Sequence, residues 1–403
     1  MKISQSRRAI VLLPLLLSAF YNLYCQSVLK TMKRIPDTGV NTGYTATPGE
    51  DADFNLFPPF FQINTNGTAI DTVTGLMWQR TDGGEMSIEK ARIYCDTLTL
   101  GGFTDWRLPY LMESHSILNH SVTNPAMDIK VFPKTGAEYW WSAETQANDT
   151  NKIWVSNAGG GVGNHAKTET VSAGGTKKFH VRAVRSIINT VAIPVRFADN
   201  GNGSITDALT GLIWLKKASA DSLSWENALL YADSCTAGGF SDWRLPNVKE
   251  LQSLTDIKLL NPCFNKSYLQ FTGRKFWTST TLPNQTGSAW YLDNRYGITT
   301  YDPKIRKNYC FLLRGGAEPT NSSKFVSAQV RVWPNPFSDR INTNSGLPTG
   351  LVHYRLVDHA GRIVFAGDNP GEYNFSSLTA GVYILQYNGV RQGALRLIKK
   401  VTD

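Results

Sequence analysis

The chain has 403 residues, 41% of them hydrophobic and 18% charged, and its formal net charge is +9. This length leaves room for several domains, each with a core of its own. The charge is too small and too dispersed for a nucleic-acid-binding face, which needs clustered basic residues.

The first 25 residues predict an export signal. Lys2, Arg7 and Arg8 precede an apolar run over residues 9–20, which is too short to span a bilayer. No other stretch is apolar enough for a membrane helix. The mature protein is therefore predicted to be soluble or surface-attached, outside the cytoplasm.

The middle of the chain contains an internal repeat. Residues 101–109 (GGFTDWRLP) return as 238–246 (GGFSDWRLP), an offset of 137, and residues 74–78 (TGLMW) return as 210–214 (TGLIW). An almost constant offset over whole units indicates two copies of one fold. The predicted order is an export signal, an extended arm, copy one, copy two, a polar linker and a terminal module: residues 1–25, 26–60, 61–187, 195–317, 318–325 and 326–403.

Each copy has the same expected elements in the same order. A turn rich in Asn and Gly leads into a short strand, and a helix follows with Ser87 or Ser224 as its N-cap. The Gly-Gly pair ends that helix, and a second helix opens at Pro109 or Pro246. Short strands then alternate with loops. Helices early and strands late predict an α+β fold for each copy.

The repeated tryptophans allow two interpretations. An exposed indole can stack on a sugar ring, but these tryptophans follow or sit among apolar residues, and indole burial contributes much packing. We therefore predict that they are structural: Trp78, Trp106, Trp141 and Trp154 in copy one, and Trp214, Trp243, Trp277 and Trp290 in copy two.

The charged residues of the repeated motif are also predicted to be structural. Arg107 and Arg244 each stand six residues before a glutamate of the next helix, Glu113 or Glu250. A guanidinium binds a carboxylate through two parallel hydrogen bonds. We expect this pair to hold the crossing loop against the second helix. The same structural role is assigned to the aspartates of the motif, Asp105 and Asp242.

Catalysis is hard to place in the repeated fold, and we predict that the chain is not an enzyme. All six histidines lie outside copy two, so a histidine-based triad or metal site cannot be intrinsic to the fold. Acids at matching positions leave a paired-carboxylate hydrolase as an alternative. Residues 199–204 (DNGNGS) hint at calcium, but glycines stand where ligands are needed. We therefore expect a turn there, and no cofactor.

Loops late in each copy are the predicted place for recognition, because loops on a rigid scaffold commonly carry binding. They bring basic groups near the same strand in both copies, and a merely solvated basic rim is the alternative. The candidate ligand-binding residues are Asn157, His165, Lys167, Lys177 and Lys178 in copy one, and Asn294, Arg295, Lys304, Arg306 and Lys307 in copy two.

Four cysteines follow the export signal: Cys95, Cys235, Cys263 and Cys310. They allow three complete pairings, and an exported chain can keep disulfides. We favour Cys235–Cys310, which would join the first helix of copy two to its last strand. Cys95 and Cys263 would then be free or paired with each other. No Cys-x-x-Cys spacing or Cys/His cluster indicates zinc.

Residues 326–403 form a different module. Apolar and alternating runs are separated by turn signals, without a helical period. This pattern predicts a small antiparallel β-sandwich.

Both copies resemble the Lcl C-terminal domain family. The resemblance is carried by residues 35–39 (IPDTG) and 49–51 (GED), both TGLxW and both DWRLP segments, and residues 139–142 (YWWS). It implies a C-type-lectin-like fold, and the family's named member is a glycan-binding adhesin. Members often have a cysteine where copy one has Ala183. In copy two both family cysteines are shifted but keep their faces, which supports the Cys235–Cys310 pair.

The terminal module is similar to the sorting domain of type IX secretion. The matching segments are residues 332–337 (VWPNPF), 358–362 (DHAGR), 378–383 (LTAGVY) and 397–400 (LIKK). The resemblance implies passage through the periplasm, recognition by the outer-membrane machinery, and a final place in the medium or on the cell surface. The expected sorting residues are Pro334, Asn335, Pro336, Gly361, Gly381, Lys399 and Lys400.

The leading functional hypothesis is a secreted or surface-anchored tandem lectin-like binding protein, an adhesin for polysaccharide or extracellular matrix. One alternative is an enzyme on the same fold, such as a non-hydrolytic formylglycine-generating type. Another is a passive component of the envelope.

Overall fold

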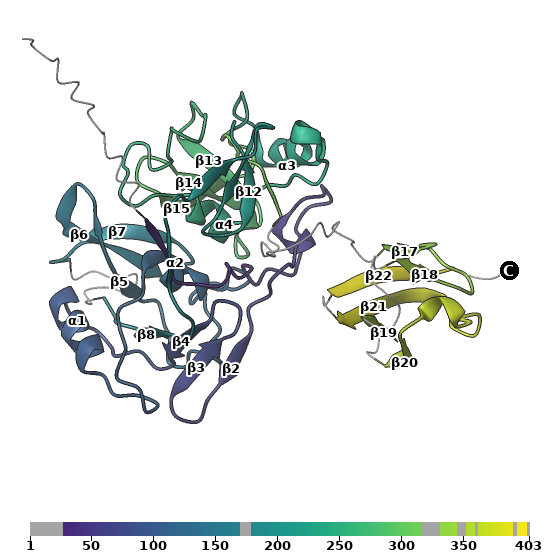
Figure 1. Ribbon diagram of the computed structural model, residues 1–403, viewed down its shortest axis with the longest axis horizontal. Helices are drawn as coiled ribbons and strands as arrows, with labels where there is room; N and C mark the ends of the chain where they lie inside the picture. The colour runs from purple at the N-terminus through teal and green to yellow at the C-terminus, as the bar shows by residue number, and fades with distance from the viewer. Residues whose placement is uncertain are drawn as a thin grey trace, which may run out of the picture. The chain divides into compact units, whose positions relative to one another are not determined.

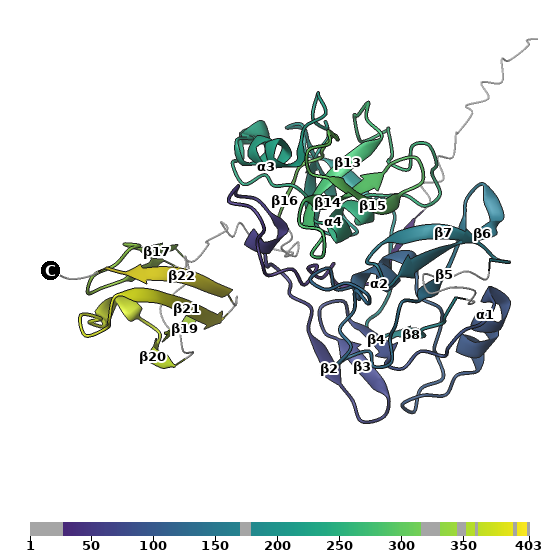
Figure 2. The same ribbon diagram turned by 180° about the vertical axis from the view of Figure 1, so that it is seen from behind.

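The computed structural model of the chain describes residues 27–169, 179–315, 331–344, 352–358, 362–389 and 393–400. The chain divides into two compact units, Met1–Glu318 and Pro319–Asp403, drawn from two sides in Figures 1 and 2. The larger unit contains the arm and both copies. The predicted export signal and linker lie outside the described residues.

The larger unit consists mostly of antiparallel strands. In copy one they are β2 (Phe61–Ile63), β3 (Thr68–Asp71), β4 (Leu76–Gln79), β5 (Tyr139–Gln146), β6 (Asp149–Asn157), β7 (Val162–Ala166) and β8 (Val184–Ser186). In copy two they are β10 (Phe197–Asp199), β11 (Ser204–Asp207), β12 (Leu212–Leu215), β13 (Lys275–Thr281), β14 (Ser288–Asp293), β15 (Ile298–Pro303) and β16 (Leu313–Gly315).

The two copies have the same pair of sheets. A four-stranded sheet has the order β2-β3-β4-β8 in copy one and β10-β11-β12-β16 in copy two. A three-stranded sheet follows, β5-β6-β7 or β13-β14-β15. Among the described strands, none joins a sheet of the other copy. A separate short sheet pairs β1 (Val28–Lys30) of the arm with β9 (Val191–Ile193), which lies between the copies. The repeat in sequence is therefore a repeat in fold.

Each copy also has two short helices. They are α1 (Ile88–Thr97) and α2 (Leu111–Ser116) in copy one, and α3 (Trp225–Asp233) and α4 (Val248–Ser253) in copy two. Single 3-10 turns occur at η1 (Asp51–Asp53) in the arm and η2 (Ala237–Gly239) in copy two. Within the part of the chain that is described, no helix is long and apolar enough to cross a bilayer.

The helix starts follow local hydrogen bonding. Ser87 caps α1 and its hydroxyl accepts the Lys90 amide, while Ser224 holds the same place before α3. The second helices begin two residues after the predicted prolines. Glu113 Oε2 accepts the amide of Tyr110, and the corresponding glutamate of α4 accepts that of Asn247. These bonds make residues 110 and 247 the caps.

All eight repeated tryptophans are buried, none with more than 4% of its surface exposed. Trp106 and Trp243, which belong to the DWRLP motif, donate their indole N–H groups to the carbonyls of Leu100 and Ala237. The indole N–H groups of these two residues are thus satisfied at the core edge. All eight side chains therefore lie in the buried core.

The structure corrects the predicted disulfide, because all four described cysteines are free thiols. Helix α3 ends at Asp233, so the helical spacing that suggested the pair does not extend to Cys235. Cys235 lies half-buried at the edge of an apolar cluster that contains buried Cys310. Burial raises the pKa of the Cys310 thiol to about 12 and that of Cys95 likewise to about 12.

In the described part of the smaller unit, the regular secondary structure consists of strands and one 3-10 turn. A four-stranded antiparallel sheet has the order β20-β19-β21-β22, and β17 pairs with β18. Their bounds are β17 (Arg331–Trp333), β18 (Asn342–Asn344), β19 (Val352–Val357), β20 (Ile363–Gly367), η3 (Pro370–Glu372), β21 (Gly381–Gly389) and β22 (Gly393–Lys399). Aromatic and aliphatic side chains, Phe337, Phe375 and Leu385 among them, form its core.

The predicted sorting residues connect the start of this unit to its last strand. Asn335 Oδ1 accepts the Ile398 amide, and the Lys400 amide donates to the Phe337 carbonyl. Lys399 is buried with its ammonium 6.0 Å from the Phe337 ring. Pro334 is exposed beside Asn335 and Pro336, and Gly381 opens β21. Gly361 lies outside the described residues.

Candidate ligand-binding site

The predicted arginine–glutamate pair is present in both copies. Arg107 Nη1 and Nη2 lie 2.7 and 2.8 Å from the two carboxylate oxygens of Glu113, and Arg244 makes the same contacts with Glu250 at 2.7 and 2.6 Å. Because each glutamate also caps its helix, the pair ties the crossing loop to the start of the second helix.

The aspartates of the motif bind a different partner. Asp105 accepts two hydrogen bonds from Arg185 on β8, and Asp242 accepts two from Arg314 on β16. The DWRLP segment is thereby joined to the last strand of its copy as well as to the second helix. The charged side chains of this segment are therefore paired with other side chains of the same copy.

The late loop of copy one packs against copy two. Asn157 Oδ1 accepts the Gly159 amide, and Gly160 packs against Trp290 of copy two. The amide of Val162 donates to Thr299 Oγ1 across the same junction. Copy two covers part of this loop, and Asn157 is half-buried, so its assignment to ligand binding stays a prediction.

Asn294 has an equally structural role. It is 2% exposed, and its Oδ1 accepts hydrogen bonds from the amide of Phe264 and the thiol of Cys263. It fixes the turn between β14 and β15. Its neighbour Arg295 is exposed, with its guanidinium 5.1 Å from the ring centre of Tyr296.

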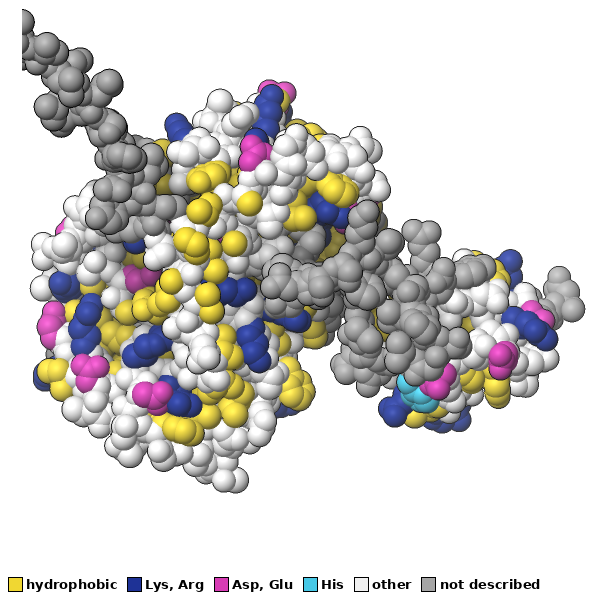
Figure 3. Space-filling view, in the orientation of Figure 1, with side chains coloured by type: hydrophobic (Ala, Val, Ile, Leu, Met, Phe, Trp, Pro, Cys, Tyr) yellow, Lys and Arg dark blue, Asp and Glu magenta, His cyan; other side chains and the backbone are white. Residues whose placement is uncertain are grey.

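The remaining basic candidates do not gather in one place. Arg295 precedes β15, whereas Lys304, Arg306 and Lys307 follow it. The Lys304 ammonium lies 3.7 Å from the ring centre of Trp225, and burial lowers its pKa. Arg306 and Lys307 are exposed. On the face shown in Figure 3 the Lys and Arg side chains are scattered among apolar and acidic ones.

In copy one the structure describes two of the basic candidates, His165 and Lys167. His165 pairs with Glu169, Nδ1 to Oε1 at 2.9 Å, and its ring packs against Tyr139 and Phe179. Lys167 is half-buried beside it, with its amide bonded to the Asn151 carbonyl. Lys177 and Lys178 lie outside the described residues.

The segment that hinted at calcium is a hairpin turn between β10 and β11. Asp199 Oδ1 accepts the Gly201 amide, and its Oδ2 lies 2.7 Å from the Lys216 ammonium. Over the described ranges, no group of three or more His, Cys, Asp or Glu side chains is placed to hold a metal ion.

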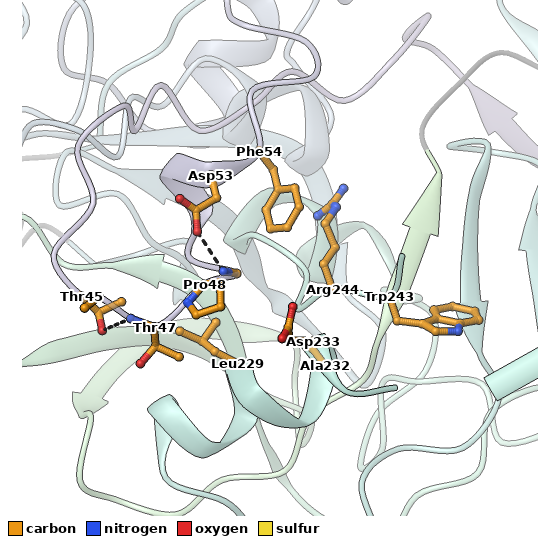
Figure 4. Close-up of a pocket in the computed structure, with 12 residues that line it drawn as sticks. Thr45, Thr47, Pro48, Asp53, Phe54, Leu229, Ala232, Asp233, Trp243 and Arg244 are labelled. Carbon is orange, nitrogen blue, oxygen red and sulfur yellow. Dashed lines mark hydrogen bonds between the residues drawn. The ribbon is translucent and has the colours of Figure 1, made fainter. Parts of the chain in front are cut away.

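A pocket of about 410 Å³ lies between the arm and copy two (Figure 4). This volume is in the range typical of small-molecule sites. The arm contributes Thr45, Ala46, Thr47, Pro48, Gly49, Asp53 and Phe54; copy two contributes Leu229, Ala232 and Asp233 from α3, with Trp243 and Arg244 from the repeated motif. Sequence reasoning did not find this pocket, because its walls are separated by almost half the chain.

Hydrogen bonds hold the arm wall in shape. Glu50 Oε2 accepts the amides of Tyr44 and Thr45, and Asp53 Oδ2 accepts that of Gly49. The Thr45 hydroxyl donates to Glu226 Oε2 on α3 at 3.0 Å. The arm is thus folded on itself and joined directly to the opposite wall.

Deeper contacts fix the arm to copy two. Asp51 Oδ2 accepts the Thr280 hydroxyl at 2.7 Å, and the Glu50 carboxylate accepts that of Thr281. The Lys249 ammonium of α4 donates to the carbonyls of Asp37 in the arm and Ser116 at the end of α2. One buried cation therefore links the arm, copy one and copy two.

Burial shifts the titration of these groups. Loss of solvent raises the pKa of Asp51 to about 7 and that of Asp37 to about 6, because burial disfavours the charged carboxylate. It lowers the pKa of Lys249 to about 8 for the same reason. Beside them, buried His120 stacks edge-on against Trp290, and burial lowers its pKa to about 3.

At the equivalent place in copy one, the contacts come from side chains of copy one itself. Glu144 Oε2 accepts the Leu111 amide at the start of α2. In copy two the same position holds Thr280, and the carboxylate comes from the arm residue Asp51. Arg107 is covered by Tyr110, with 4.9 Å between guanidinium and ring centre. The arm therefore builds its pocket with copy two.

The sequence and the fold now define the class of protein. The Lcl C-terminal domain matches residues 67–185 and 203–314, which together exceed half of the chain, and the chain belongs to this family. Residues 331–401 match the secretion system C-terminal sorting domain. The protein is therefore exported by the type IX route to the medium or the cell surface, as predicted.

The chain was also compared with curated proteins and with solved structures. No curated protein matches the chain. Among solved structures, it is similar to PorZ of Porphyromonas gingivalis, described as an essential bacterial surface component of the type-IX secretion system, with 13% sequence identity and a TM-score of 0.17. The match covers 86% of this chain and 39% of PorZ. A TM-score of this size does not establish a shared fold.

Proposed function

We propose that the protein is an exported binding protein for polysaccharide, built from two C-type-lectin-like modules of the α+β class. The pocket between the arm and copy two is the observation that carries this proposal. Its lining offers hydroxyl and carboxylate groups for sugar hydroxyls, and the apolar surfaces of exposed Pro48 and half-buried Phe54 for a ring face. Small-molecule sites commonly combine these two kinds of contact.

The arm makes the pocket rigid before any ligand arrives. Its backbone is held by Glu50 and Asp53, and its carboxylates bond to copy two. A preformed site loses little conformational entropy on binding. Because the arm contributes to copy two, we propose one such site per chain, with copy one serving as the platform on which the arm and copy two are fixed.

Surface location gives the site its role. A chain delivered by the type IX sorting domain meets polysaccharides of the medium, of neighbouring cells or of a host matrix. We therefore propose adhesion, or capture of polysaccharide, at the cell surface.

A glycan array with the purified full chain tests the proposal. Asp233→Trp should fill the pocket and abolish binding, because the exposed Asp233 side chain lies in its wall. Asp96 occupies in α1 the place that Asp233 occupies in α3, so Asp96→Trp is a matched control that should bind normally. Failure of the unmodified chain to bind any saccharide would refute the proposed function.

A further inference from the structure

The pocket between the arm and copy two has an uneven charge. Asp53 stands on the arm wall and Asp233 on the α3 wall, on different sides of the space in Figure 4. Both side chains are exposed. Asp53 uses one carboxylate oxygen for the Gly49 amide, and its other oxygen remains available for a ligand.

Among the described residues that line the pocket, the one cation is Arg244, and it is already neutralised. Both terminal nitrogens of Arg244 are bonded to Glu250, and Phe54 lies over its guanidinium at 5.1 Å. A carboxylated or sulfated sugar would therefore meet two aspartates of the described lining, whose arginine is already paired. An anionic ligand is disfavoured here by like-charge repulsion.

The geometry points to a saccharide that carries a protonated amine as the ligand of this pocket. The inference rests on the proposed function and specifies its ligand class. An ammonium group can donate to a carboxylate of either wall through a charge-assisted hydrogen bond, which is stronger than a neutral one. Ring hydroxyls can bond to Thr47 beside them, and the ring face can lie against Pro48 or Phe54.

Three oligosaccharides of equal length separate the alternatives by titration calorimetry on the full chain. They are a β-1,4-linked glucosamine oligomer, its fully N-acetylated form, and a heparin fragment. We expect the glucosamine oligomer to bind about tenfold or more tightly than the acetylated form, the difference that a hydrogen bond to a charged group supplies. This preference should shrink as salt is raised.

Two charge-removing variants identify the groups. Asp233→Asn and Asp53→Asn should each reduce the preference for the amine, and the asparagine oxygen can still accept the Gly49 amide. Asp96→Asn, at the matching position of copy one, should leave the preference unchanged. Both aspartates are exposed, so thermal unfolding of the variants should match that of the unmodified chain.

The outcomes distinguish the inference from the function. Equal or tighter binding of the acetylated oligomer or of heparin, or an unchanged preference in both Asp variants, would overturn the amine assignment while the saccharide-binding function stands. Binding of no saccharide at all, here or on the array, would overturn both.

Discussion

Removal of the Arg244 guanidinium tests the structural role of the repeated motif. Arg244→Ala leaves the carboxylate of Glu250 buried without its bidentate partner; the two side chains are only 6% and 8% exposed. Breaking a buried pair on one side costs about 3–5 kcal/mol. Loss of the contact with Phe54 adds about 0.5–1 kcal/mol. We therefore expect about 4 kcal/mol of destabilisation.

Copy one provides the control for this substitution. Arg107 is 30% exposed, so water can reach the site when its guanidinium is removed. We expect Arg107→Ala to cost about half as much, roughly 2 kcal/mol. Arg244→Ala with Glu250→Leu should recover part of the lost stability, because the double variant leaves no unpaired buried charge.

Urea and thermal unfolding followed by tryptophan fluorescence would measure these effects. For a unit of this size, about 4 kcal/mol corresponds to a fall in Tm on the order of 10 °C. An Arg244→Ala variant as stable as the unmodified chain that had lost only ligand binding would refute the structural assignment. A larger loss for Arg107→Ala than for Arg244→Ala would refute the argument from burial.

Three further predictions concern pH, thiols and surface charge. Burial raises the pKa of Asp51 from 3.8 to about 7, so between these pH values the folded state holds a proton that the unfolded state has lost. As pH rises through this range, the free energy of unfolding therefore falls by up to about 1.4 kcal/mol per pH unit. Asp51→Asn should therefore gain stability relative to the unmodified chain as pH rises from 5 to 7, and a pH-independent difference in urea unfolding would contradict this. In protein purified without reductant, Cys235 should react with a thiol reagent in the native state and Cys310 only after denaturation; mass spectrometry showing neither thiol reactive in denaturant would indicate a disulfide instead. Asp105→Ala should cost no more than about 1 kcal/mol, because this carboxylate is 60% exposed beside Arg185, and a loss as large as that of Arg244→Ala would show that the exposed pair is essential.

Local and repeated features of the sequence were enough to predict much of the scaffold. The constant offset gave two copies with the same pair of sheets, and the apolar surroundings of residues such as Trp78 and Trp214 gave their burial. The Arg–Glu spacing gave a bidentate pair in each copy because it depends only on one loop and the first turn of one helix. The predicted disulfide was wrong because the prediction placed Cys235 in a helix that ends before this residue.

The candidate site was decided by contacts between distant segments. Periodicity reports whether a residue is buried, but not which other segment covers it. The loop at Asn157 is polar and rich in glycine, as an open loop would be, yet copy two packs over it. The arm reads as a polar extension, yet the carboxylates of Glu50 and Asp51 are buried against copy two.

The sequence by itself therefore determined the two modules, their tryptophan cores, the structural role of the motif and the export route, because each depends on short-range patterns or on a terminal domain recognisable from its own residues. Only the tertiary structure decided where a ligand could bind. The pocket exists because Asp51 and Lys249 anchor the arm across copy two, and such long-range pairing has no local signature in the chain.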